Sequence, residues 1–394
     1  MGDYRIGLTS NGIEHYRRDR EEIDRAIQGV LDHGGFVMGP DVPAFEAEFA
    51  AHCEAGYAVA VTSGTSALLI ALLAAGVEPG DEVIGVANAD LAISLAAVHR
   101  NARLKWVDIE EDTFNVDPVK LGEALTPETR AVVIAHMYGL PADMDRIKDV
   151  MADYPEAVLI EDASLATGAR YRGRRVGAIG DIGCFSLAST KVLGVLGSGG
   201  ALTTDDPEYY RRINWVRHYG RTQTPYNYDD PLPPSSAPAG MVIPGLNERM
   251  DSLQAAVGRV KLRKLDADLH RRREIAALYD EILADAPCRL PVLPAGYTHC
   301  YRVYTITVDP GIRDAFAEEM RERGIDAGAH YVPPDHLHPY FRERGGHPGM
   351  LPVTEGMADA LVCLPSHAYL TPEEANHVAV SARDILLRLA PGRI

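Results

Sequence analysis

Short apolar runs alternate with stretches of helical periodicity over the first half of the chain. Such a rhythm predicts βαβ units, and therefore a mostly parallel sheet with helices on both faces. Right-handed crossovers bring the connecting loops to one edge of that sheet, where α/β proteins bind their ligands. The predicted strands lie at 58–61, 82–86, 104–108, 131–136, 158–160, 182–186 and 201–204.

Helical periodicity also marks both ends of the chain. The last predicted helix begins at Thr371, with Glu374 in the capping-box position. Because 394 residues exceed what one compact core usually holds, we expect two domains. The larger would comprise residues 1–250 with the N-terminal segment, and a smaller C-terminal domain, 251–394, would be linked to it by a long helix. The other elements predicted at the two ends are helices at 22–32, 42–51, 271–283 and 312–323 and a strand at 302–308.

Composition narrows the classes of partner. The net charge is −17, with 46% hydrophobic and 24% charged residues, so we expect no nucleic-acid or anionic-membrane partner, which would require basic surfaces. The longest apolar run, 67–75, is too short to cross a bilayer, and the first residues lack the apolar segment of a signal peptide. Five widely spaced cysteines without a C-x-x-C pair are typical of reduced thiols in a cytoplasmic protein.

Two residues with complementary chemistry follow neighbouring predicted strands. The strand at 158–160 leads to Asp162, and a carboxylate at the carboxyl end of a buried parallel strand faces the ligand crevice. Lys191 lies in a small-residue loop after the strand at 182–186, and a glycine-dense turn at 194–200 follows it. A desolvated lysine can form a Schiff base with an aldehyde cofactor, whose ring nitrogen a carboxylate can keep protonated. The alternative is an ordinary surface lysine and an N-cap aspartate.

A turn of small residues separates the strand at 58–61 from an apolar helix at 67–75. It reads Thr-Ser-Gly-Thr-Ser and contains Gly64, Thr65 and Ser66. Backbone N–H groups at the positive end of a helix bind phosphate without a basic side chain. The sequence therefore predicts a phosphate site here, with a capped helix start that binds no ligand as the alternative.

Longer sequence motifs are found over nearly the whole chain. They are TSGTSAL, EDASLATGA, GDIGCFSLASTK with the GSGG turn after it, GLNERMDSLQAAVG and HYVPPDH. Together they resemble the DegT/DnrJ/EryC1/StrS aminotransferases, pyridoxal phosphate (PLP) enzymes that aminate keto-sugars and keto-cyclitols. The resemblance implies PLP-dependent transferase fold type I: an α/β large domain with a mostly parallel seven-stranded sheet, plus a smaller C-terminal α/β lobe. It implies transfer of an amino group from glutamate or glutamine to a keto-sugar, with a nucleotide-linked one favoured, or to a keto-cyclitol, in amino-sugar or secondary-metabolite biosynthesis.

The resemblance also implies roles for individual residues. Lys191 would hold PLP as a Schiff base and then carry a proton, while Asp162 would keep the ring nitrogen protonated. Capping the helix that runs through residues 253 and 257 is an alternative role for Asn247. A homodimer would share its active sites, because the expected phosphate ligands are Gly64, Thr65, Ser66, Ser186 and Asn247 of the partner subunit. The candidates for binding the donor carboxylate and the acceptor hydroxyls are Arg249, His330 and Tyr331.

Two positions depart from the family pattern. The loop after the strand at 82–86 contains Asp90 and lacks the aromatic residue that stacks on the cofactor ring in the family. Leu165 stands where the family has Gln or His. Both departures favour an atypical acceptor, and they leave a catalytically silent, PLP-binding regulatory protein as an alternative. The family's dehydratase branch, which has histidine in place of Lys191, is not favoured.

Two other ligand classes are not expected. The glycines at 194–200 lead into a strand and not a helix, so a dinucleotide fingerprint lacks its structural context. Prolines interrupt the segment that holds His330, Asp335, His336 and His338, so no metal site is predicted there. A long loop at 225–244, rich in Pro, Tyr and Asp, is expected to be functional.

Overall fold

The structure is a computed structural model that describes residues 6–9, 12–222 and 239–390. Most of the predicted loop at 225–244 lies outside the described residues. Within the described ranges, no helix combines the length and the apolar character that a membrane crossing requires.

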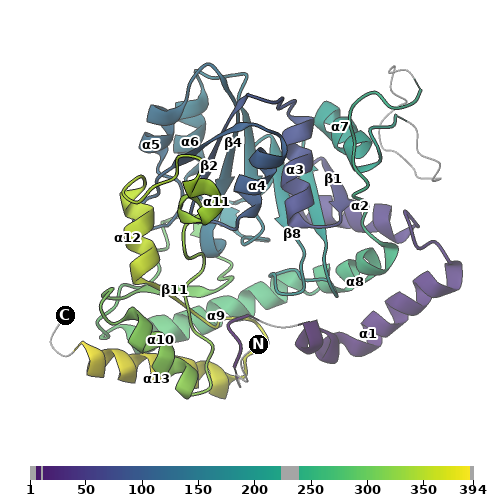
Figure 1. Ribbon diagram of the computed structural model, residues 1–394. Helices are drawn as coiled ribbons and strands as arrows, with labels where there is room; N and C mark the ends of the chain where they lie inside the picture. The colour runs from purple at the N-terminus through teal and green to yellow at the C-terminus, as the bar shows by residue number, and fades with distance from the viewer. Residues whose placement is uncertain (1–5, 10–11, 223–238, 391–394) are drawn as a thin grey trace.

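A seven-stranded sheet forms the centre of the larger part of the molecule (Figure 1). The strand order is β1-β9-β8-β5-β4-β2-β3; β9 runs antiparallel to both neighbours, and the other pairs are parallel. β5, β8 and β9 are buried along their whole length, as expected for a sheet covered on both faces. The mostly parallel sheet is thus confirmed. Its strands are β1 Tyr57–Val61, β2 Glu82–Val86, β3 Arg103–Val107, β4 Thr129–Ala135, β5 Val158–Asp162, β8 Ile182–Ser186 and β9 Gly200–Thr204.

Helices cover this sheet and extend from it (Figure 1). α3 packs against β8 and β9 and is covered in turn by α4 and α7, so this helix is apolar nearly all round. α2 packs against β1 and α8, and α8 also contacts α1. These helices are α1 Gly12–His33, α2 Asp41–Cys53, α3 Gly64–Ala74, α4 Ala92–His99, α5 Pro118–Ala124, α6 Met144–Met151, α7 Pro207–Arg217 and α8 Ser252–Leu262.

A second hydrophobic core lies among the C-terminal elements. Helix α9 connects the two cores, because its Leu269 packs in the first core and its Ile275 in the second. The domain boundary between residues 250 and 251 stays a prediction. The elements around the second core are helices α9 Leu265–Leu283, α10 Arg313–Glu322 and α13 Pro372–Leu389 with the antiparallel pair β11 Tyr304–Thr307 and β12 Leu361–Leu364. The remaining elements are α11 Pro339–Arg342, α12 Pro352–Ala360, the short turns η1 Met137–Gly139 and η2 Asp335–Leu337, and a small sheet of β6 Arg170–Tyr171, β7 Arg174–Arg175 and β10 Tyr297–Thr298.

The predicted elements agree with the structure better for strands than for helices. Each predicted strand ends within two residues of an observed one. The helix predicted at 22–32 begins already at Gly12 and has a kink at Asp19, where φ is −111°. The capping role considered for Asn247 is wrong: α8 begins at Ser252, and the backbone of Asn247 pairs with His218. The predicted capping box of the last helix is confirmed.

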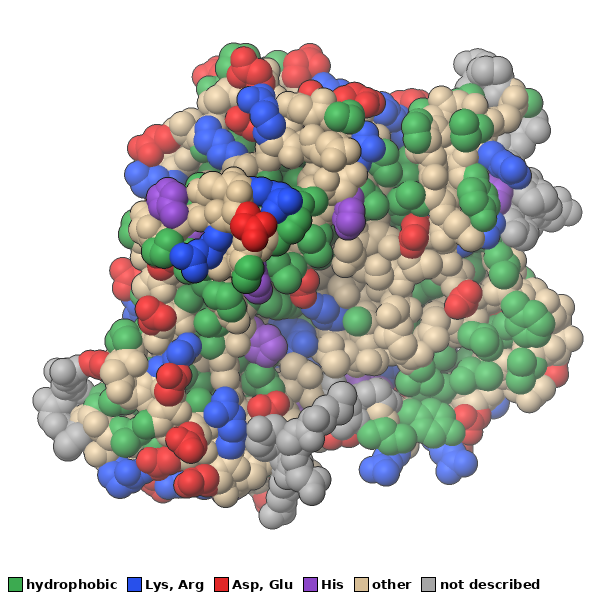
Figure 2. Space-filling view, in the orientation of Figure 1, with side chains coloured by type: hydrophobic (Ala, Val, Ile, Leu, Met, Phe, Trp, Pro, Cys, Tyr) green, Lys and Arg blue, Asp and Glu red, His purple; other side chains and the backbone are tan. Residues whose placement is uncertain are grey.

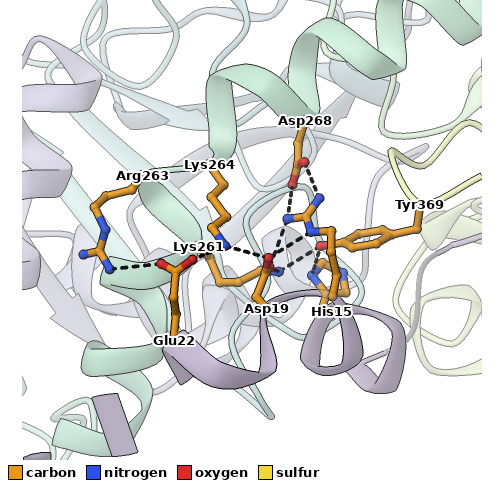
Figure 3. Close-up of polar contacts among 9 residues, drawn as sticks. His15, Asp19, Glu22, Lys261, Arg263, Lys264, Asp268 and Tyr369 are labelled. Atoms are coloured by element: carbon orange, nitrogen blue, oxygen red, sulfur yellow. Dashed lines mark hydrogen bonds and ion pairs between the residues drawn. The ribbon is translucent and has the colours of Figure 1, made fainter. Parts of the chain in front are cut away.

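A cluster of charged residues joins α1 to α8 and α9 (Figure 3). Asp19, at the kink of α1, is 4% exposed and accepts hydrogen bonds from Arg18 at 3.0 Å, from Lys261 at 2.7 Å and from Lys264 at 2.8 Å. Arg18 also forms an ion pair with Asp268 of α9 at 2.5 Å. We call these five residues, Arg18, Asp19, Lys261, Lys264 and Asp268, the Asp19 cluster. Their opposite charges fix α1 onto the α8–α9 junction.

Candidate active site

The carboxyl ends of five strands meet at one edge of the sheet. Because β9 is antiparallel to both β1 and β8, strand β1 runs in the same direction as β8, β5, β4 and β2. The loops after these strands surround a cavity of about 320 Å³, and Figure 2 shows that this face of the molecule is hollowed near its middle. The lining includes Gly64 and Thr65 after β1, Asp90 after β2, Ala135 at the end of β4, Asp162 at the end of β5, and Ser186 and Lys191 at and after the end of β8.

Two neighbouring carboxylates of β5 have different environments because successive side chains of a strand point to opposite faces. Glu161 accepts hydrogen bonds from three backbone N–H groups in the segment 177–180 and is fully buried. Asp162 lines the cavity, is 6% exposed and accepts a hydrogen bond from the N–H of Ser164 at 3.0 Å. Burial raises the pKa of Asp162, against the opposing effects of Ser164 and of the Lys191 charge. This carboxylate therefore lacks a full cationic partner of its own.

Lys191 lies in a tight loop between β8 and β9. Gly194 makes the loop possible, because a Cβ atom there would lie 2.8 Å from the carbonyl oxygen of Ser189. The lysine lines the cavity, where burial and then the charge of Arg302 lower its pKa to about 8, although Asp162 opposes this shift. An amine with such a pKa is available near neutral pH as a nucleophile and as a proton carrier.

The turn from β1 to α3 forms another wall of the cavity. A Cβ atom at Gly64 would lie 2.7 Å from the Cβ atom of Ser186, so glycine allows this close approach to β8. Ser63 caps α3 by accepting a hydrogen bond from the N–H of Ser66 at 3.0 Å. The first turn of a helix has backbone N–H groups without intrahelical partners, and Gly64 and Thr65 bring this turn to the cavity. The wall is therefore suited to an anion.

Three predicted site residues lie outside the cavity lining. The Ser66 hydroxyl donates a hydrogen bond to Glu248 at 2.7 Å. Asn247 is exposed on the surface of the chain. Arg249 Nη1 lies 2.9 Å from His218 Nδ1. Within one chain these residues do not join the cavity, and their proposed roles stay predictions.

A smaller cavity of about 170 Å³ continues from the first one at Lys191. His330 and Tyr331 line it, as the sequence motif led us to expect. Burial lowers the pKa of His330 and raises the pKa of Tyr331, so at neutral pH the imidazole is neutral and the phenol protonated. Arg302 lines the same cavity, and the sequence analysis missed it. Its one signal was a lone arginine in the apolar run CYRVYTI.

The histidine-rich segment that contains these residues makes several separate contacts. The His336 ring nitrogen lies 3.0 Å from Glu355, and Asp335 accepts a hydrogen bond from the Ser94 hydroxyl at 2.5 Å. Within the described ranges, no group of three or more His, Cys, Asp or Glu residues is arranged to hold a metal ion.

This fold and this cavity define a PLP-dependent transferase of fold type I, with a lysine in the loop after β8 and a carboxylate at the end of β5. The sequence profile of the DegT/DnrJ/EryC1/StrS aminotransferase family matches residues 17–383. The chain belongs to this family. It is therefore an aminotransferase, and its cofactor is PLP.

Known proteins of this family are similar to the chain over nearly its whole length. It is 38% identical to the dTDP-3-amino-3,4,6-trideoxy-alpha-D-glucose transaminase of Streptomyces venezuelae, over 94% of this chain and 93% of that one. It is 34% identical to the UDP-N-acetyl-3-dehydro-alpha-D-glucosamine 3-aminotransferase of Acidithiobacillus ferrooxidans, over 94% and 96% of the two chains. The solved structure of DesV from S. venezuelae has a TM-score of 0.89 and 36% identity and covers 98% of both chains.

Proposed function

We propose that this chain transfers an amino group from glutamate or glutamine to a nucleotide-linked keto-sugar, or to a keto-cyclitol, in amino-sugar or secondary-metabolite biosynthesis. The observation that carries the proposal is the meeting of Lys191 and Asp162 in one cavity beside the first turn of α3. The sugar acceptor is supported by relatives named as transaminases of dTDP- and UDP-linked sugars.

The cavity residues fit PLP at three points. The raised pKa of Asp162 reflects a buried carboxylate without a full cationic partner, and a protonated ring nitrogen would be that partner. Gly64, Thr65 and Ser186 offer backbone N–H groups and hydroxyls to a phosphate. Lys191 offers an amine of lowered pKa to the aldehyde. Bound PLP supplies the electron sink for the carbon atom that loses its proton.

The chain's own residues would then bind, orient and move a proton. The Nζ atom of Lys191 would accept the proton from the Cα atom of the donor and deliver it to the cofactor carbon atom that receives the amino group, a task suited to a pKa of about 8. Asp162 holds its negative charge at the end of β5, where the strand fixes its position. His330 and Tyr331 line the side of the cavity from which a substrate would approach Lys191.

Reductive trapping tests this proposal. Borohydride treatment of the purified protein should fix the cofactor on the peptide that contains Lys191, and mass mapping should find it there. Addition of glutamate or glutamine before the reductant should remove the label, because the lysine is released. A label on any other lysine, or a bound chromophore that does not respond to amino donors, would reject the assignment.

We further propose that two chains form a homodimer with shared sites, with Asn247 of the partner subunit reaching the phosphate. The proposal is supported by the exposure of Asn247 and by its position outside the cavity lining of its own chain. Mixing the inactive variants Lys191→Ala and Asn247→Ala should restore turnover, because the mixed dimer has one site with both wild-type residues. Random mixing predicts about a quarter of the wild-type activity. No recovery from mixed dimers would reject the shared site.

The described residues also support two coarser proposals. A division into a large domain, 1–250, and a smaller one, 251–394, is supported by the two hydrophobic cores and by α9 between them. A cytoplasmic location is supported by the five cysteines, all of which are free thiols.

A second candidate function is PLP binding with an atypical, non-sugar acceptor or without turnover. Two observations favour it: Asp90 lines the cavity where the family pattern has an aromatic residue, and Leu165 lines it in place of Gln or His. A panel of keto-sugars, keto-cyclitols and simple keto acids, offered to the amino form of the enzyme, separates the candidates. Turnover of a nucleotide-linked keto-sugar favours the first, and inertness toward the whole panel favours the second.

A further inference from the structure

The smaller cavity is an extension of the cofactor cavity on the side of Lys191. Its volume of about 170 Å³ is enough for a small organic group. The polar side chains that line it are the phenols of Tyr138 and Tyr331, the imidazole of His330, the guanidinium of Arg302, the amine of Lys191, the hydroxyl of Thr190 and the carboxylate of Asp90. The residues that line both cavities are Asp90, Leu165, Thr190, Lys191 and Tyr331.

Arg302 is a buried cation without a carboxylate partner in the part of the chain that the structure describes. Its side chain belongs to a residue only 8% exposed, and its Nε atom is buried without a hydrogen-bond acceptor. Arg217, by contrast, forms an ion pair with Glu46. Arg272 resembles Arg302 in having a buried Nε atom without an acceptor, but its Nη1 atom donates to the carbonyl oxygen of Tyr301 at 2.9 Å, whereas Arg302 lines a cavity. A buried guanidinium with no anion costs free energy unless a ligand supplies one.

The backbone around Arg302 is fixed to the end of β4. The N–H of Arg302 donates to the carbonyl oxygen of Tyr138 at 2.9 Å, and the N–H of Cys300 donates to that of Gly139 at 3.0 Å. Gly139 has a φ of 105°, and a Cβ atom there would lie 2.5 Å from the sulfur of Cys300, so glycine permits this contact. The backbone that carries Arg302 is therefore held at the same sheet edge as Asp162.

We propose that Arg302 binds a carboxylate of the substrate in the smaller cavity and thereby orients the adjacent carbon atom toward Lys191. The inference rests on the proposed aminotransferase function and deepens it. A planar guanidinium matches a carboxylate with two parallel hydrogen bonds, and the small volume suits a carboxylate better than a diphosphate. The arginine that the sequence motif suggested for this task, Arg249, lies against His218 in this chain.

The charged side chains that line the cavity are Arg302, Lys191 and Asp90, so cationic side chains outnumber the one carboxylate there. Burial lowers the pKa of Arg302 to about 10, which reflects a cation that lacks a compensating anion. The charge of Arg302 also contributes to the lowered pKa values of Lys191 and His330. A bound carboxylate would offset that charge, so it would raise the pKa of both groups at the moment when a proton carrier is needed.

The test uses the PLP-loaded enzyme and glutarate, a dicarboxylate that has no amino group and cannot react. Calorimetric titration should show that Arg302→Gln weakens glutarate binding by roughly 10- to 100-fold, because charge-assisted hydrogen bonds are lost. Arg302→Lys should fall between wild type and Arg302→Gln, because it keeps the charge and loses the two-pronged geometry. Arg289→Gln is the control: this partly exposed residue pairs with Glu111 and Asp112, lines neither cavity and should leave glutarate affinity unchanged.

Equal glutarate affinity of wild type and both Arg302 variants would overturn the inference, and so would wild-type enzyme that binds neither glutarate nor glutamate. If Arg302→Gln does not fold, the comparison with Arg302→Lys still decides. This result is independent of turnover, so a failure of the proposed function would appear separately, as an enzyme that binds glutarate but does not exchange amino groups.

The two half-reactions show whether the carboxylate that binds Arg302 belongs to the amino donor or to the acceptor. If it is the α-carboxylate of the donor, Arg302→Gln should weaken reaction with glutamate and have little effect on isoglutamine, in which that carboxylate is an amide. If it belongs to the acceptor, the variant should discriminate less between a 3-oxo sugar nucleotide with a sugar carboxylate and its uncharged counterpart. A variant that behaves as wild type with all four compounds would reject both sources.

Discussion

The Asp19 cluster and the cofactor cavity both bury charged groups, but they treat them in opposite ways. Asp19 is 4% exposed and is hydrogen-bonded by Arg18, Lys261 and Lys264 (Figure 3). Asp162 is 6% exposed and receives its hydrogen bond from a neighbouring backbone N–H. Two aspartates of nearly equal exposure therefore differ mainly in the cations beside them.

This difference appears in the direction of the pKa shifts. Burial opposes ionisation at both sites, but the cations around Asp19 outweigh it and hold the pKa of that carboxyl well below its usual range. At Asp162 burial prevails and the pKa rises. A buried charge whose partners are built into the fold stabilises the fold, whereas a buried charge without them is ready for a ligand. The comparison predicts that substitutions in the Asp19 cluster change stability and that substitutions in the cavity change turnover.

The largest effect is expected for Lys191→Ala. This variant removes both the nucleophile and the proton carrier, so turnover should fall by roughly 10⁴-fold or more. The temperature of unfolding of the cofactor-free protein should change little, because burial disfavours the charged amine of Lys191 and its removal therefore costs little. Turnover and thermal unfolding are measured side by side. Lys120→Ala, which removes an exposed lysine paired with Glu123, is the control and should match wild type in both. Substantial turnover by Lys191→Ala would contradict the comparison.

The next effect concerns stability. Asp19→Asn keeps the size of the side chain but leaves Lys261 and Lys264 without their shared carboxylate, so the free energy of unfolding should fall by about 3–5 kcal/mol. Turnover of the folded enzyme should stay within about two-fold of wild type, because the cluster does not line the cavity. Denaturant titration measures the first quantity and an assay at low temperature the second.

The control on the same helix is Asp24→Asn, which removes an exposed ion pair with Arg20 and should cost at most about 0.5 kcal/mol. pH provides an independent check. Because the folded-state pKa of Asp19 is depressed, its contribution to stability is present above about pH 4, its unfolded-state pKa, and is lost as the pH falls below that value. Asp19→Asn should lack this acid-dependent loss. An Asp19→Asn protein that is as stable as Asp24→Asn would reject the structural role.

A third prediction uses two neighbours on one strand. Asp162→Asn should retain PLP and lose roughly 10²- to 10³-fold in turnover, the usual cost of removing one preorganised charged partner. Glu161→Gln should leave turnover nearly unchanged and lower the unfolding free energy by about 1–3 kcal/mol. The reason is that it weakens the hydrogen bonds from backbone N–H groups in 177–180. Both variants are measured by cofactor absorbance, turnover and denaturant titration. Loss of turnover in Glu161→Gln without loss of stability would contradict the assignment of the two faces.

The features that could be predicted from the sequence are those with local signals. Apolar runs located the strands, and the position of Asp162 and Lys191 after two of them placed both residues in one cavity. Arg302 gave almost no signal, because its role depends on contacts with η1 at the end of β4, far away in the sequence. The Asp19 cluster was missed for the same reason: Asp19 and Lys261 are 242 positions apart.

Motif similarity also had a physical limit. Within one chain the Ser66 hydroxyl donates to Glu248 and Arg249 lies against His218, so the roles that the motif implies for these two residues stay predictions. A motif records which residue types recur, whereas the direction of a side chain depends on the neighbours that pack around it. The proposed shared site of two chains lies beyond local signals altogether, because a single chain's pattern contains no information on how its copy is placed.

The smallest predicted effect is a change in the pKa of Lys191, measured in one variant of the cavity and in one variant of the Asp19 cluster. In the cofactor-free protein, the rate at which Lys191 reacts with a limiting amine reagent should rise with pH and level off above its pKa of about 8. Arg302→Gln removes a nearby positive charge, so the pKa of Lys191 should increase, and the reaction rate at neutral pH should fall by about the factor that the pKa shift specifies. Asp19→Asn, which removes a charge from the other buried cluster, should leave the titration unchanged. Mass spectrometry of the labelled Lys191 peptide gives the profile for each variant. Identical profiles for wild type and Arg302→Gln would show that the guanidinium does not act on the lysine, and a shift in Asp19→Asn would show that the two clusters are not independent.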